Sequence, residues 1–95
     1  MKISRQVESE IPEFSSHESA REYFKNKYGN HFVMMNSEMI GDEKVYFYSL
    51  ILDRKVFEDG QKQMVKDGFM VDALNFMNSY QPVEIFEDGR IHIIH

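Results

Sequence analysis

The residues of this chain that could carry out chemistry are four histidines, sixteen acidic residues and the hydroxyl groups of serine and tyrosine, because cysteine is absent. A nucleophilic triad needs a serine with a histidine within hydrogen-bond reach. Ser16 and His17 are neighbours in the sequence, but the start of a helix accounts for the serines at this point. We therefore assign no catalytic residue. The five glycines are isolated and form no phosphate-binding loop.

A metal site would need three or four converging ligands. His92 and His95 are three residues apart on a predicted strand, so their side chains point to opposite faces. Glu84 is predicted to lie opposite His92 on the adjacent strand, which brings together two ligands and no third. We therefore expect a carboxylate–imidazole pair here, and we predict neither a metal site nor a cofactor.

One set of polar and aromatic residues is predicted to share a single face of the sheet. Aromatic rings beside polar groups on an open sheet are typical of binding platforms. The alternative is an ordinary amphipathic outer face. The predicted binding residues are Asn36, Glu38, Tyr46, Tyr48, Glu84, Phe86, Arg90 and His92.

The stretch from Lys44 to Asp53 is predicted to be the central strand of this sheet. It is rich in aromatic and β-branched residues, which favour a strand over a helix. Both of its alternating sets of side chains are mainly apolar. We therefore expect cover on both of its faces.

A hairpin over about residues 32–52 would pair this strand with the one before it. A two-residue loop would place Glu38 beside Val45 and mix a charge with the core. A three-residue loop would place Met39 beside Val45 and Glu38 beside Tyr46 instead. We predict the three-residue loop because it separates the two faces better.

A second hairpin is predicted over residues 83–95, with a three-residue loop that ends at Gly89 in the left-handed conformation. This loop sets Ile85 opposite Ile91 and gathers four aliphatic side chains on one face. The last strand lacks the lysines and prolines that normally protect a free edge. We therefore expect it to pair on its second side, with the central strand or with a second copy of the chain.

Three helices are predicted from caps and spacing. One covers about residues 16–28, capped by Ser15 with Glu18 three residues later. A second begins after Asp53 and ends at Gly68. A short third helix covers about residues 72–79. Methionines that fall on predicted core positions are Met35, Met39, Met64 and Met77.

Together these elements predict an α+β fold: an antiparallel sheet of at least four strands, with two or three helices packed on one face. The 95 residues suit a single compact domain. Residues 1–13 are predicted to be partly loop, with a short edge strand over Lys2–Val7.

Composition narrows the function classes. A net charge of −5 opposes binding to nucleic acid. We see neither an apolar leader at the N-terminus nor a run of the roughly 20 apolar residues that would span a membrane, so we expect a cytoplasmic protein.

The leading hypothesis is a small non-catalytic interaction or regulatory module that binds a protein partner or itself through the predicted face. The alternative is a small-molecule binder or modifying enzyme that uses the same face.

Overall fold

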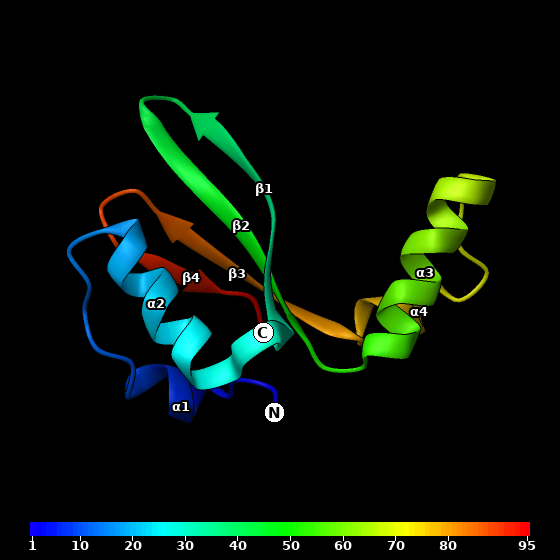
Figure 1. Ribbon diagram of the computed structural model, residues 1–95, viewed down its shortest axis with the longest axis horizontal. Helices are drawn as coiled ribbons and strands as arrows, with labels where there is room; N and C mark the ends of the chain where they lie inside the picture. The colour runs from blue at the N-terminus through cyan, green and yellow to red at the C-terminus, as the bar shows by residue number, and fades with distance from the viewer.

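The computed structural model describes residues 1–95 and has the predicted α+β architecture, with four antiparallel strands in one sheet and four α-helices (Figure 1). The strand order is β1-β2-β3-β4, so strands adjacent in the sequence are adjacent in the sheet. The strands are β1 Phe32–Ile40, β2 Glu43–Ile51, β3 Tyr80–Phe86 and β4 Ile91–Ile93. The helices are α1 Arg5–Ser9, α2 His17–Tyr28, α3 Arg54–Asp67 and α4 Ala73–Met77, with a 3₁₀ turn, η1, at Gly29–His31.

Strand β2 is central, as the sequence predicted, because it pairs with β1 on one side and β3 on the other. Its side chains are buried on both faces. Tyr48 and Leu50 are buried toward one face, and Val45 and Ile51 toward the other. The mainly apolar character of both alternating sets follows from this two-sided burial.

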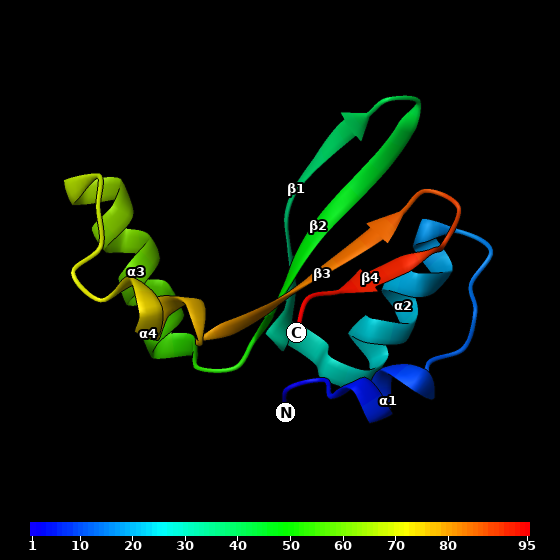
Figure 2. The ribbon, with the colours of Figure 1, turned by 180° about the vertical axis from the view of Figure 1, so that it is seen from behind.

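Helices α1 and α2 lie over one face of the sheet, which we call the covered face (Figure 2). Ala20 and Phe24, one helical turn apart on α2, are fully buried there. The ring of Phe24 stacks on Phe32 at a centroid distance of 4.9 Å, and Phe32 stacks on Tyr48 at 4.5 Å. Each fully buried side chain of this size contributes about 1.5–3 kcal/mol to folding, so this stack joins α2 firmly to the sheet.

Helix α2 begins one residue later than predicted, because Ser16 is its N-cap and not Ser15. The Ser16 hydroxyl accepts from the Ser19 N–H at 3.2 Å. The His17 N–H donates to the carbonyl of Glu87 in the β3–β4 turn, at 3.0 Å. This tertiary hydrogen bond helps to set the start of the helix. A local capping pattern could not predict it, because Glu87 is distant in the sequence.

The predicted edge strand over Lys2–Val7 is wrong, because helix α1 occupies that position. Ser4 caps α1 by accepting from the Val7 N–H at 3.1 Å. Ile3 is buried, and its backbone hydrogen-bonds to the side chain of Gln81 and not to a strand. A glutamine side chain therefore takes the place of the expected strand partner.

Helices α3 and α4 form an arm, residues 54–77, that projects from one end of the sheet and does not join α1 and α2 over the covered face (Figures 1 and 2). Asp53 caps α3 and Gly68 ends it with a φ of 76°, both as predicted. A cluster of three rings attaches the arm to the sheet. The ring centroid of Phe57 lies 5.6 Å from that of Phe76 and 5.3 Å from that of Tyr80.

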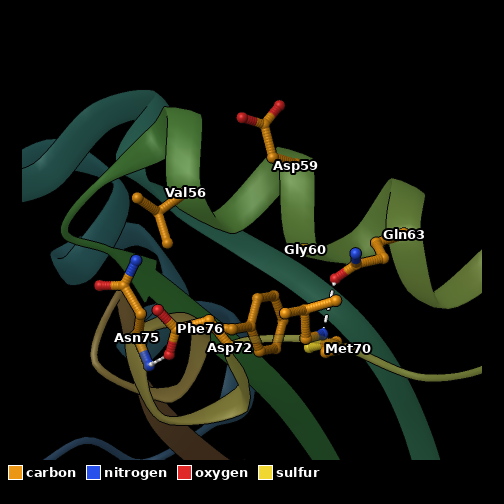
Figure 3. A pocket seen from close by; sticks show the side chains of 9 residues that line it. Val56, Asp59, Gly60, Gln63, Met70, Asp72, Asn75 and Phe76 are labelled. Atoms are coloured by element: carbon orange, nitrogen blue, oxygen red, sulfur yellow. Dashed lines mark hydrogen bonds between the residues drawn. The ribbon is translucent and has the colours of Figure 1, made fainter.

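Gly60, in the middle of α3, allows α4 to approach closely. A Cβ at this position would overlap the ring of Phe76, which lies directly against the helix (Figure 3). A glycine inside a helix costs about 1 kcal/mol relative to alanine. The stacking of Phe76 on Phe57 offsets that cost and holds the two helices of the arm together.

The predicted three-residue loop of the first hairpin is wrong. Ile40 pairs with Glu43 and Met39 with Lys44, which leaves a two-residue loop, and a bulge between Met34 and Asn36 changes the register again. The prediction assumed that both faces of β1 had to be sorted into core and surface. The structure removes that requirement, because β1 is exposed from Met34 to Ile40.

The second hairpin has the predicted register, with Ile85 opposite Ile91 and a three-residue loop closed by Gly89 at a φ of 93°. Ile93 belongs to the core under the helices, as expected. However, β4 pairs only with β3, so the expected pairing with the central strand is wrong. The chain segment around Phe14 lies against the turn at Gly89 instead.

Candidate functional site

The corrected register divides the eight predicted binding residues between the two faces of the sheet. Tyr46 pairs with Ile85 and Tyr48 with Val83, which places both tyrosines on the covered face. The other six residues lie on the opposite side, which we call the open face: Asn36, Glu38, Glu84, Phe86, Arg90 and His92.

The two tyrosines join a network with His17, which the sequence did not single out for binding. The His17 ring stacks on Tyr46 at a centroid distance of 3.5 Å. His17 Nε2 shares a hydrogen bond of 2.7 Å with the Tyr48 hydroxyl, and the Tyr46 hydroxyl donates to Glu87 at 2.8 Å. The network therefore docks the start of α2 on β2. No local signal could have revealed it, because the residues come from three separate segments.

Partial burial changes the protonation of this network. Desolvation lowers the pKa of His17 below its usual value, against the opposing field of Glu87. Desolvation likewise raises the pKa of Tyr48. The folded protein therefore favours a neutral imidazole beside a neutral phenol, an arrangement that suits packing between a helix and a sheet.

We expect stability to fall as the pH drops through the ordinary histidine pKa of about 6.5, because unfolded His17 takes up a proton that folded His17 resists. Urea unfolding midpoints measured from about pH 7.5 to about pH 5.5 would show this slope. The slope should be smaller in His17→Gln. Equal slopes in wild type and His17→Gln would contradict the assignment.

The polar groups of the open face are largely paired with one another. Glu84 and His92 form the predicted cross-strand pair at 2.9 Å. The Arg90 guanidinium lies 4.5 Å above the Phe86 ring and forms ion pairs with Asp88 and Glu43. Exposed ion pairs of this kind contribute little to stability, because water screens them. These charged groups therefore satisfy one another and leave little unpaired charge for a ligand.

An apolar hollow lies where the open face meets the arm, and we call it the junction hollow. Its volume is about 240 Å³. Phe47 from β2, Phe57 from α3 and Phe76 from α4 are among the side chains that line it, and its polar residues include Ser49, Gln61 and Glu84. A second hollow of about 340 Å³ lies between α3 and α4 and is lined by Asp59, Gln63, Asp72 and Asn75 together with apolar residues (Figure 3).

Large apolar side chains are exposed on β1, on both sides of the sheet, and on the arm. Predicted core methionines of β1 and α3 are among them, with Met39 exposed by 63% and Met64 by 48%. The exposed side chains on β1 are Met34, Met35, Met39 and Ile40, and those on the arm are Met64, Val65, Phe69, Val71, Leu74 and Met77. The sequence missed this surface because its methionines and aliphatics fit the spacing of a core equally well.

The shape of the molecule agrees with this exposure. Its accessible surface is 6262 Å², whereas a folded monomer of its mass has about 5,700 Å². Its radius of gyration is 14.1 Å, against about 12 Å for a compact chain of this length. The projecting arm and the uncovered β1 account for the difference.

No three histidine or acidic side chains lie close enough together to hold a metal ion. No helix has the length and apolar character needed to cross a membrane. Comparisons with protein-family models, with curated proteins and with solved structures give no match.

Proposed function

We propose that this chain is a non-catalytic module that binds another protein through its uncovered apolar side, formed by the open face, β1 and the arm. The observation that carries the proposal is the concentration of exposed large apolar side chains on β1 and the arm. β1 and the arm carry ten of the twelve large apolar side chains that are exposed, and exposed apolar surface concentrated in this way often marks an interaction site. The proposal keeps the predicted function but moves its centre away from Tyr46 and Tyr48.

The arm offers the strongest anchors for such a partner. Phe69 is exposed by 61%, Val71 by 80% and Leu74 by 71%. Burying one side chain of this size is worth about 1.5–3 kcal/mol, and a few such residues commonly carry most of the energy of an interface. The junction hollow lies at the base of the arm and could receive an apolar side chain of the partner.

The alternative, a small-molecule binder or modifying enzyme, has less support. It relied on Tyr46, Tyr48, Arg90 and His92 sharing one face, and the two tyrosines lie on the other. The junction hollow, at about 240 Å³, is smaller than the 300–1,000 Å³ or so of typical ligand pockets. The hollow of about 340 Å³ between α3 and α4 contains none of those four residues.

The test is capture from an extract of the organism that encodes the chain, with the full-length protein immobilised. We expect a protein to be retained by wild type and lost from the double variant Phe69→Ser/Leu74→Ser. The matched control, Glu22→Gln/Asn26→Ser, changes two exposed residues of α2 and should retain it. Equal retention by all three forms, or none by wild type, would overturn the proposal.

A further inference from the structure

The outer edge of β1 is the longest unpaired strand edge of the molecule. β1 has nine residues and pairs only with β2, whereas the opposite edge strand, β4, has three. No helix or strand lies alongside this edge, and the arm stands apart from it in both views (Figures 1 and 2). Its only charged residue is Glu38, and it contains neither lysine nor proline. Such an edge is a template for another strand.

The register of the first hairpin determines which backbone groups this edge offers. In a two-residue hairpin the residues that flank the loop, here Ile40 and Glu43, form a hydrogen-bonded pair, and such pairs then alternate along the strands. Glu38 and Asn36 therefore direct their backbone groups toward β2. The N–H and C=O groups of Ser37 and Met39 point outward, free to pair with an added strand.

We propose that β1 pairs antiparallel with β1 of a second copy, about a two-fold axis that passes through Ser37. This inference rests on the proposed function and deepens it by naming one partner, a second copy of the chain. Pairing about Ser37 sets Asn36 opposite the partner's Glu38, so that an amide meets a carboxylate twice in the symmetric pair. It also brings Met39 near Met35 of the second copy.

Other two-fold registers fit less well. An axis at Glu38 would set two carboxylates opposite each other, which destabilises a strand pair. An axis at Met39 would leave most of β1 unpaired. With the axis at Ser37, residues 36–38 of the two copies pair directly, the bulge between Met34 and Asn36 falls at each end of the joined ladder, and the exposed apolar side chains of β1 become partly covered.

The test is the mass of the purified full-length chain in solution, by sedimentation velocity or light scattering. We expect wild type at twice the 11.3 kDa of one chain. Ser37→Pro should give the single mass with an unchanged circular dichroism spectrum, because it removes an outward N–H that β2 does not use. If Ser37→Pro fails to fold, Met39→Lys, a charged guard on the same edge, decides the question.

Asn26→Lys is the control, since Asn26 is exposed on α2, outside the uncovered apolar side. It should keep the double mass, whereas Met39→Lys should weaken self-association at least tenfold. A monomeric wild type, or a dimer that survives Met39→Lys, would overturn the β1 pairing. A monomeric wild type that still captures a protein through Phe69 and Leu74 would leave the proposed function standing.

Discussion

Replacing Gly89 by alanine is expected to destabilise the protein by about 2–5 kcal/mol, combining left-handed strain with steric overlap. Gly89 has a φ of 93°. A Cβ there would overlap the carbonyl oxygen of Phe14 and lie 2.8 Å from the backbone nitrogen of Ser16. These are backbone atoms and cannot swing aside as a flexible side chain can. The substitution should therefore push the start of α2 off the β3–β4 turn.

Gly41→Ala is the matched control for this prediction. Gly41 also has a positive φ, 63°, but a Cβ there would meet nothing within 4 Å. It should cost only the conformational strain, about 1–2 kcal/mol. Urea unfolding of the two variants, followed by circular dichroism, measures the difference. Equal losses would show that the segment around Phe14 does not dock on the turn as described.

Replacing Gln81 by leucine is expected to destabilise the protein by about 3–5 kcal/mol, because several buried backbone groups lose their partner together. Gln81 is 1% exposed on β3. Its side-chain oxygen accepts from the Ile3 N–H at 2.8 Å, and its amide donates to the carbonyls of Ile3 and Ile94 at 2.9 and 3.2 Å. One side chain thus ties both ends of the chain to the sheet.

Gln63→Leu provides the comparison, since Gln63 also bonds a backbone N–H through its side-chain oxygen. It accepts from Val71 at 3.0 Å, but at an exposed position where water can replace it. Its loss should change stability by no more than about 0.5 kcal/mol. Guanidinium unfolding, together with amide exchange at Ile3, would separate the two variants. Slow exchange at Ile3 in Gln81→Leu would contradict the role given to Gln81.

Features that depend on neighbouring residues were predictable from the sequence. The loop that ends at Gly89, the pairing of Glu84 with His92 and the cap at Asp53 each follow from side chains only a few residues apart. The central strand was predictable for a related reason. Its apolar character on both alternating sets has few explanations other than burial on both faces.

The register of the first hairpin was not predictable by the same reasoning. Sorting polar from apolar side chains works only where one face of a strand is buried. Beyond Met34 neither face of β1 has cover, so Glu38 lies beside Val45 without entering a core. The error placed Tyr46 and Tyr48, a quarter of the predicted binding residues, on the wrong face.

The remaining parts of the candidate site depend on contacts between distant segments. His17 meets Tyr48 across 31 positions of the chain, and the arm leaves the covered face although the spacing of α3 is that of a packed helix. An apolar stripe has the same sequence pattern whether its partner lies in the same chain or in another. For this reason the sequence pattern could not show that the methionines of the arm and β1 are exposed.

The central claim, that the uncovered apolar side is covered by protein in the cell, is tested most directly by photo-crosslinking through methionine. The tagged chain would be expressed in its own organism with a photoreactive methionine analogue, then irradiated and purified. We predict crosslinks to a second copy or to another protein from the exposed methionines of β1 and the arm, Met35, Met39, Met64 and Met77. Crosslinks found only within single molecules of the chain, and none between molecules, would contradict the claim.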